Sequence, residues 1–341
     1  QAESIAGGLA LLPMRQWWGG QRVAMTGIAS VGIAPEYRGS GAALTLLQHM
    51  LQELFDRQVP LSVLYPATQR LYRKVGYEQG GTFQNWSISP AQIQLQGTLP
   101  FHAVEPNQTE ILRPIQQQYA RLQNGHLDRH PALWQQIAQS ETNDPIYAYV
   151  IGSMAQPEGY VVFTQQRTGG SGVLRLQDWA ILSAEAGRSL WGFLAGHRSQ
   201  IDEVRFRGAA IDPWLLLLPE QEMTVQSTMQ WMLRIVNVPL ALAKRGYPPG
   251  IETELHLEVK DDWLPENSDR FVLSLYQGQA QVERGGKGEL KLDIRGLAPL
   301  YSGLFTPHQL AFMGYLDGSD TALHTAARLF AGSSPWLPEF F

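Results

Sequence analysis

The residues best suited to do chemistry lie in and around a turn that contains glycines. The turn follows an apolar run and precedes apolar residues at helical spacing. The segment comprises Val31, Gly32, Ile33, Arg38, Gly39, Ser40, Gly41, Ala42 and Ala43. Backbone N–H groups in such a turn and in the first helical turn have no partner inside the helix, and the helix dipole adds partial positive charge. Gly39 and Gly41 let the backbone approach a ligand, and Arg38 can add a charged contact. The segment predicts a pyrophosphate site, with a solvated turn as the alternative.

The last seven residues form a second unusual segment, Pro335-Trp336-Leu337-Pro338-Glu339-Phe340-Phe341. A free tail of this composition would expose three large aromatic rings to water. We therefore expect the tail to pack against the protein.

Two other motifs carry weaker signals. His126 and His130 are four residues apart, but no third ligand is apparent, so no metal site is predicted. The run 285–288 (Gly-Gly-Lys-Gly) resembles a phosphate loop only superficially, because no Ser or Thr follows Lys287. A hairpin turn between two strands is the better interpretation.

The composition restricts the class of protein. The chain has 341 residues, 44% of them hydrophobic, which predicts two or three globular domains. A net charge of -5 argues against nucleic-acid binding and suits cationic partners such as amines. The chain contains no cysteine, which excludes disulfides, thiolate metal sites and a cysteine nucleophile. No apolar run approaches the roughly 18 residues of a membrane span, so we expect a cytoplasmic protein without membrane contacts.

The elements that position these residues follow from hydrophobic periodicity. A hairpin is predicted from strands at 4–12 and 22–34, joined by Trp18-Gly19-Gly20. Strand-like sequence also begins at Phe83, and further strands are predicted at 61–65, 146–152, 159–166, 172–182, 202–210, 252–260, 270–276, 278–284 and 288–294. Helices are predicted at 41–57, 68–75, 109–122, 131–140, 190–199, 240–245, 297–304, 307–313 and 319–330. The fold class is therefore α/β followed by α+β.

With the turn placed between a strand and a helix, the chain resembles the GNAT superfamily of N-acetyltransferases. Arg38, Gly41 and Ala43 fit the Arg/Gln-x-x-Gly-x-Gly/Ala signature that holds the pyrophosphate of coenzyme A. Val31, Ile33 and Pro35 match the Val-x-Ile-x-Pro of the family's central strand. The resemblance implies acetyl-CoA as cosubstrate and no metal.

Residues 71–77 (Leu-Tyr-Arg-Lys-Val-Gly-Tyr) are similar to a run in the Eis family. The resemblance implies that Tyr72 is the general acid that protonates the leaving thiolate. The alternative is that Tyr72 and Tyr77 are both packing residues. Arg73 and Lys74 are candidates for contacts to the outer phosphates, or are solvated.

Eis-like enzymes end in a tail of this kind, whose α-carboxylate accepts the proton of the amine, directly or through water. The resemblance assigns this role to the carboxylate of Phe341, with a plain docked tail as the alternative. A terminal carboxyl has a reference pKa of roughly 3.5, so burial by Trp336, Phe340 and Phe341 is needed to raise it.

Residues 231–239 and 243–248 are similar to the entry of the Eis sterol-carrier-protein-like domain. The implied domains are a GNAT catalytic domain (1–98), a GNAT-like domain without its own coenzyme site (99–226) and a sterol-carrier-like domain (227–341). The first is expected to lack the opening strand and helices of the fold. What remains of the amine pocket is expected to be lined by Trp17, Trp18, Ala29, Ser30 and Phe340.

The predicted function is acetyl transfer from acetyl-CoA to a primary amine, of a small molecule or a peptide. The resemblance also implies a homo-oligomer, with a hexamer as the expected form. The alternative is an apolar-ligand carrier that uses the sterol-carrier-like domain, with the GNAT units as scaffold.

Overall fold

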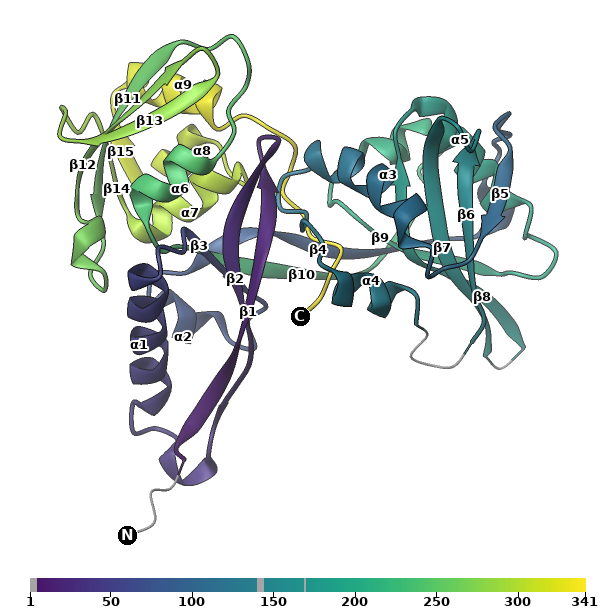
Figure 1. Cartoon of the computed structure of the whole chain (residues 1–341), viewed down its shortest axis with the longest axis horizontal. Coiled ribbons are helices and arrows are strands. Elements are labelled where there is room, and N and C mark those ends of the chain that lie inside the picture. Colours follow the sequence, from purple (N-terminus) through teal and green to yellow (C-terminus); the bar gives the residue numbers. More distant parts are fainter. Residues whose placement is uncertain (1–4, 140–143, 169) are drawn as a thin grey trace. The chain divides into compact units, whose positions relative to one another are not determined.

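The computed structural model describes residues 5–139, 144–168 and 170–341. Residues 4 and 140, which end two of the predicted elements, lie outside this part. The chain divides into two compact units (Figure 1). The first holds residues 1–82, 123–128 and 230–341, and the second holds residues 83–122 and 129–229.

The first unit begins with a sheet in the strand order β1-β2-β3-β10-β4. Its strands are β1 (Gly7–Trp18), β2 (Gln21–Ile33), β3 (Leu61–Leu64), the end of β10 (Thr224–Ile235) and the start of β4 (Glu78–Ile88). The predicted hairpin is confirmed, because β1 pairs with β2 from Trp18 opposite Gln21 to Gly7 opposite Ile33. Its two loop residues, Gly19 and Gly20, have φ of 55° and 80°, the conformation of a tight turn that matches strand twist.

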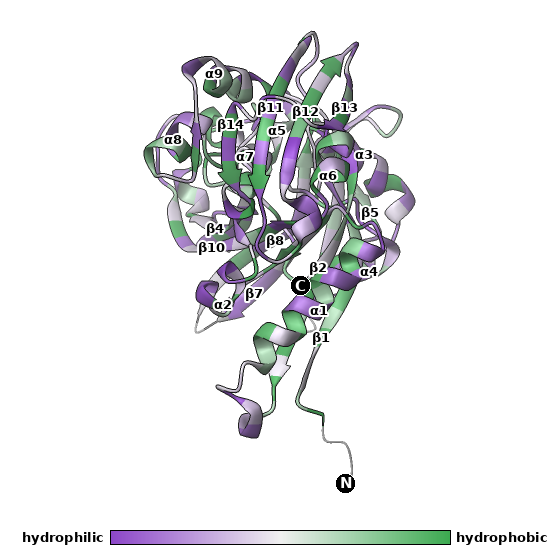
Figure 2. Ribbon diagram, turned by 90° about the vertical axis from the view of Figure 1, so that its left-hand side faces the viewer, coloured by the Kyte–Doolittle hydropathy of each residue, from purple (hydrophilic) through white to green (hydrophobic). Residues whose placement is uncertain are grey.

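Two helices cover one face of this sheet. They are α1 (Ala42–Asp56) and the short α2 (Gln69–Arg73), and the turn η1 (Pro35–Tyr37) precedes α1. Hydrophobic and hydrophilic residues alternate along α1 (Figure 2). Its buried residues are Leu47, Met50, Leu51 and Leu54. They pack in one cluster with Ile28 of β2, Leu64 of β3, and Tyr72. Both helices were predicted, α1 because its apolar positions recur at helical spacing and α2 because residues 68–75 have the length and residue mix of a short helix.

The rest of the first unit is a second sheet with helices, in the strand order β13-β12-β11-β14-β15. Its strands are β11 (Thr253–Lys260), β12 (Asp269–Tyr276), β13 (Gln279–Arg284), β14 (Leu290–Asp293) and β15 (Leu316–Gly318). Its helices are α6 (Val238–Lys244), α7 (Ile294–Ser302), α8 (Pro307–Phe312) and α9 (Asp320–Leu329), with the turn η4 (Pro265–Asn267).

The glycine run 285–288 is not the hairpin turn that the sequence predicted. β13 pairs with β12, whereas β14 lies parallel to β11 on the other side. The run is therefore a crossover between two strands that do not pair. Alternating strands on either side of a glycine run do not by themselves distinguish these two connections.

The second unit is built on the strand order β4-β9-β8-β7-β6-β5. Its strands besides β4 are β5 (Phe101–Val104), β6 (Ile146–Gly152), β7 (Pro157–Thr168), β8 (Ser171–Ile181) and β9 (Glu203–Gly208). Its helices are α3 (Thr109–Arg121), α4 (Pro131–Ile137) and α5 (Ala184–Ala195), with the turns η2 (Pro90–Gln92) and η3 (Pro213–Leu217). β8 and β9 are parallel and are connected through α5.

The predicted helix at 190–199 starts too late. α5 begins at Ala184, where the hydroxyl of Ser183 accepts a hydrogen bond from the N–H of Ala186. Ser183 is thus an N-cap, a signal that the apolar periodicity alone does not contain. The strands β5, β10 and β15 were also missed. β10 runs across the limit that the sequence analysis expected between its second and third domains, at residues 226 and 227.

Candidate active site

The turn before α1 presents backbone donors without acceptors. Gly39 and Gly41 have φ of 81° and 91°, and Gly41 is the N-cap of α1. The N–H of Leu44 bonds to the carbonyl of Gly41, which closes the first helical turn. Four N–H groups bond to none of the residues that the structure describes, those of Gly39, Gly41, Ala42 and Ala43. Such a group of donors fits a pyrophosphate, because its negative charge is stabilised by several N–H groups and by the helix dipole.

The strands that lead to this turn separate next to it. β2 and β3 run parallel and pair from Met25 opposite Leu61 to Ile28 opposite Leu64. Residues 29–33 of β2 continue beyond the last pair and pair with β1 alone among the described strands. A bulge lies in this extension, where Ser30 has a φ of 51°. The backbone of residues 29–33 therefore has one edge that β3 does not cover.

Tyr72 lies at the base of this separation. It is in α2, its side chain is 6% exposed, and it belongs to the buried cluster that contains Ile28 and Leu64. Burial raises the pKa of the Tyr72 phenol above its ordinary value, so the group is protonated at neutral pH. Its hydroxyl bonds to none of the described residues. The phenol is available as a proton donor.

Tyr77 has a different environment. Its hydroxyl shares a 2.6 Å hydrogen bond with the hydroxyl of Ser62 in β3, and its side chain is fully buried. Desolvation raises its pKa, and the hydrogen bond with Ser62 and the nearby Arg234 lower it by less. A tyrosine that is inaccessible and already paired fits the packing interpretation.

The C-terminal tail is docked on the first unit. Trp336 and Leu337 are buried, and the N–H of Leu337 bonds to the carbonyl of Thr82 at 3.0 Å. Tyr65, the residue after β3, donates its hydroxyl proton to the carbonyl of Glu339 at 2.7 Å. Its ring lies against the last two residues, with centroid distances of 4.6 Å to Phe340 and 5.6 Å to Phe341.

Gly27 in β2 makes room for the last residue, and sequence reasoning missed it. A Cβ atom at this position would lie 2.7 Å from Cε2 of Phe341, which is closer than real contacts allow. A glycine inside a strand commonly marks the close approach of another group, and that signal was present in the sequence. Which group approaches was not predictable, because Phe341 follows more than 300 residues later.

The last two rings of the tail are less buried than expected. Phe340 is 58% exposed, and Phe341 is only half-buried. Trp336 packs on His126, with the ring centroids 4.3 Å apart. Two of the three rings, those of Phe340 and Phe341, are therefore less buried than the sequence analysis expected.

The predicted amine-pocket residues do not all come together. Ala29 and Ser30 lie at the strand separation, whereas Trp17 pairs with Arg22 near the hairpin turn. Ala29 faces Ala10, so Trp17 lies seven residues farther along β1, at roughly 3.3 Å per residue. Trp17 and Trp18 are buried, and the Trp18 ring packs on Trp231 and Tyr301. Both tryptophans are therefore core residues that lie apart from Ala29 and Ser30.

The basic candidates also separate. Arg38 is exposed, and its Nε donates to the carbonyl of Ile33 at 3.4 Å, which keeps it beside the turn. Arg73 is paired instead with Glu78, at 2.8 Å. Lys74 is exposed. Of these three basic side chains, Arg38 is the one that the structure holds beside the turn, and it remains the candidate for a phosphate contact.

His126 and His130, for which no metal site was predicted, have structural roles. His126 is buried beneath Trp336, and Nδ1 of His130 accepts the N–H of Ala132 as the N-cap of α4. Within residues 5–139, 144–168 and 170–341, no group of three or more His, Cys, Asp or Glu side chains is arranged to hold a metal ion. In the same part of the chain, no helix is long and apolar enough to cross a membrane.

Three family models match the chain. Residues 1–80 and residues 125–235 each match an acetyltransferase (GNAT) domain. Residues 238–338 match a sterol carrier protein domain.

Individual proteins match over most of the chain. A GCN5-related N-acetyltransferase from Anabaena variabilis, whose crystal structure is known, is 54% identical, with a TM-score of 0.96 over 100% of this chain and 88% of that chain. An uncharacterized N-acetyltransferase from Streptomyces griseus is 27% identical over 350 residues, covering 95% of this chain and 83% of the relative. The N-acetyltransferase Eis of Mycobacterium tuberculosis is 24% identical over 311 residues, covering 87% of this chain and 75% of the relative.

Proposed function

Because the chain belongs to the Eis-like GCN5-related N-acetyltransferases, which use acetyl-CoA, we propose that it acetylates primary amines with Tyr72 as general acid and the terminal carboxylate of Phe341 as general base. One observation carries the proposal. Tyr72 and Phe341 both lie at the point where the pairing of β2 and β3 ends.

The two groups lie on opposite faces of the sheet. Successive strand residues point to opposite faces, so Ile28 faces the cluster with Tyr72 while Gly27 faces Phe341. In Figure 1, α1 and α2 lie on one side of the β1–β2 hairpin and the C-terminus lies on the other. An acetyl group at the strand separation would have the acid on the side of α1 and the base on the opposite side.

The turn before α1 is the proposed coenzyme site. The N–H groups of Gly39, Gly41, Ala42 and Ala43 would hold the pyrophosphate, and Arg38 would add a charge-assisted contact. The pantetheine would bind to the uncovered backbone edge of Val31, Gly32 and Ile33. The hydroxyl of Ser40 is used within the turn, where it donates to the carbonyl of Tyr37 at 2.7 Å. The coenzyme would thus arrive on the same side of the sheet as Tyr72.

The proton transfers follow from this arrangement. The amine nitrogen bonds to the acetyl carbon, and the bond from that carbon to sulfur breaks. The proton that the amine loses goes to the Phe341 carboxylate, directly or through water. The Tyr72 phenol gives its proton to the leaving sulfur, which departs as the free thiol. General acid and base steps of this kind typically contribute 10² to 10⁴-fold each.

The acceptor class is an amine of a small molecule or a peptide. The net charge of -5 favours cationic substrates, and Phe340 offers an exposed aromatic ring next to Tyr65 at the proposed amine side. We propose Ala29, Ser30 and Phe340 as contacts of the amine.

The direct test is a panel of amines assayed by release of free thiol from acetyl-CoA. Aminoglycosides, polyamines and lysine peptides form the panel, and the expected result is amine-dependent release for at least one class. Thermal melting supplies the comparison with a lipid carrier. Acetyl-CoA at 100 times its Kd is expected to stabilise the chain by about 2.7 kcal/mol. Stabilisation by a fatty acid or sterol alone, with no thiol release for any amine, would contradict the proposal.

A further inference from the structure

The segment that carries Tyr72 is too short to hold its own orientation. α2 has five residues, and isolated helices of this length do not form in water. The carbonyl of Tyr72 accepts the N–H groups of Val75 and Tyr77 at 3.0 Å and 3.2 Å, so the position of Tyr72 depends on the chain that follows it. The groups that hold residues 73–78 therefore decide where the phenol points.

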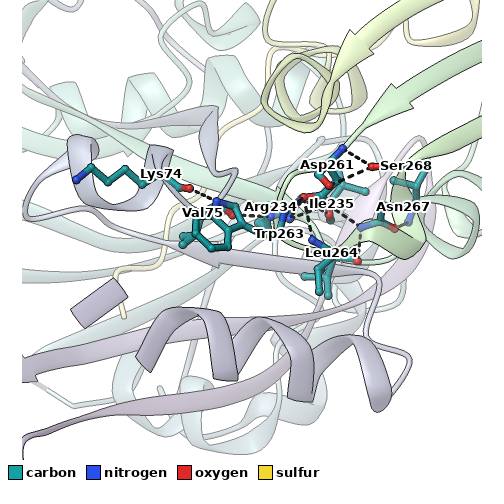
Figure 3. A network of polar contacts seen from close by, with 11 residues as sticks. Lys74, Val75, Arg234, Ile235, Asp261, Trp263, Leu264, Asn267 and Ser268 are labelled. Carbon is teal, nitrogen blue, oxygen red and sulfur yellow. Dashed lines mark hydrogen bonds and ion pairs between the residues drawn. The ribbon is translucent and has the colours of Figure 1, made fainter. Parts of the chain in front are cut away.

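Arg234 holds Val75 from the end of β10. Its Nε donates to the Val75 carbonyl at 2.9 Å, and its Nη2 donates to both carboxylate oxygens of Asp261 at 2.8 Å and 2.7 Å (Figure 3). Both side chains are fully buried. The Nδ2 of Asn267 adds a bond to Asp261 at 2.9 Å. A buried, multiply bonded guanidinium has one available geometry, so it fixes the carbonyl that it contacts.

Two further contacts hold the residues on either side. The indole N–H of Trp263 donates to the carbonyl of Lys74. The side chain of Arg73 is paired with Glu78, and Glu78 is paired with Arg295 of α7 at 2.6 Å.

We propose that Arg234, Asp261 and Trp263 are positioning residues for Tyr72, and that the sterol-carrier-like domain acts as a clamp on the general acid. Asp261 and Trp263 lie within the matched region 238–338, and Arg234 is oriented by Asp261. This inference rests on the proposed function, because it assumes that Tyr72 is the acid. It gives the domain a role in the proton transfer to sulfur that needs no ligand of its own.

A buried ion pair is weak evidence for a purely stabilising role, because apolar residues of similar volume are often equally stable in its place. What an apolar pair cannot supply is a donor to the Val75 carbonyl. The contact at Gly76 is also tight, since a Cβ atom there would lie 2.8 Å from Nε of Arg234. The guanidinium and the chain after α2 are thus fitted to each other.

The test compares Trp263→Phe with a matched control. Trp263 is 37% exposed, so its replacement by Phe keeps the fold and removes one indole N–H bond to a backbone carbonyl. Trp179→Phe in the second unit removes the same kind of bond, to the carbonyl of Arg207 at 2.9 Å. We expect Trp263→Phe to lower kcat by about three- to tenfold with an unchanged KM for acetyl-CoA, and Trp179→Phe to leave kcat unchanged.

A double-mutant cycle separates positioning from a general structural effect. In a Tyr72→Phe background there is no phenolic proton to position, so Trp263→Phe should no longer change kcat. The same cycle with Asp261→Asn should give the same loss of effect. If Asp261→Asn fails to fold, the Trp263 cycle alone decides.

The outcomes distinguish the two levels of the proposal. If Tyr72→Phe itself keeps the wild-type kcat, Tyr72 is not the acid and the proposed function fails in that respect. Two results would overturn only the positioning role, provided that Tyr72→Phe lowers kcat at least tenfold. In the first, Trp263→Phe leaves the wild-type kcat unchanged. In the second, Trp263→Phe lowers kcat equally in the wild-type and the Tyr72→Phe backgrounds.

Discussion

A valine at Gly27 is predicted to displace the C-terminal residue without affecting the coenzyme site. Valine suits a strand, so the backbone of β2 accepts the change. Its Cβ would lie 2.4 Å from Cε of Met14 and 2.7 Å from Cε2 of Phe341. Met14 can move because the contact is at the end of a flexible side chain. The Phe341 ring lies against Gly27, with its centroid 5.6 Å from that of the Tyr65 ring, and must leave its position.

The size of the effect follows from the buried area of that ring. Full burial of a phenylalanine is worth about 1.5 to 3 kcal/mol, and Phe341 is half-buried, so the tail loses about 1 kcal/mol of docking free energy. That corresponds to about a fivefold drop in the equilibrium ratio of docked to undocked tail. Because the valine also occupies space that the Phe341 ring fills, we expect Gly27→Val to lower kcat at least about fivefold, and up to about 10²-fold if the general base is lost outright.

The assay is thiol release at saturating acetyl-CoA, together with the Kd for acetyl-CoA by titration calorimetry. Gly8→Val is the matched control, since a Cβ atom at Gly8 of β1 meets no atom within 4 Å. A folded Gly27→Val protein with the kcat of the Gly8→Val protein would refute the role of the docked tail.

Three further predictions concern other parts of the molecule. Gly41→Val should weaken acetyl-CoA binding more than Arg38→Ala, because a φ of 91° is strained for valine and the backbone supplies several donors; equal Kd values for the wild type and Gly41→Val would remove the turn from the site. Burial would raise the pKa of Glu78, but hydrogen bonds from Arg73 and Arg295 outweigh burial and lower the pKa below its ordinary value of 4.5. The ionised Glu78 therefore stabilises the fold above about pH 4.5, and this stabilisation is lost as the pH falls. Urea unfolding from pH 6 to pH 3 should show a smaller loss for Glu78→Gln than for the wild type, and equal slopes would contradict the assignment. Light scattering at micromolar concentration should give the mass of a homo-oligomer, with a hexamer as the expected form, and a monomer mass would exclude an oligomer.

The parts that short motifs determine were predictable. The helix α1, the turn at Gly39 and Gly41 and the hairpin at Gly19 each depend on residues within one short stretch, and their predictions are confirmed. The predictions of tandem GNAT-like folds, a sterol-carrier-like domain and membership of the Eis-like acetyltransferases are confirmed as well.

Contacts between distant residues were not predictable. Gly27 is needed because Phe341 packs against it, and the position of Val75 depends on a hydrogen bond from Arg234. No local sequence pattern indicates either contact. The expectation that Trp17 lines the amine pocket depended on such contacts as well. Alternation along β1 predicts a strand but does not say what packs against the end that carries Trp17. The catalytic roles of Tyr72 and Phe341 stay predictions.

The central claim is that the terminal carboxylate of Phe341 accepts the proton of the amine. Its most direct test is the kcat of a chain extended past Phe341 by a few Gly and Ser residues, which turns that carboxylate into a neutral amide and leaves every side chain unchanged. We predict a kcat at least about tenfold lower, with an unchanged Kd for acetyl-CoA. A folded, intact extended protein that acetylates its best amine at the wild-type rate would contradict the claim and leave Phe341 as a structural residue of the tail.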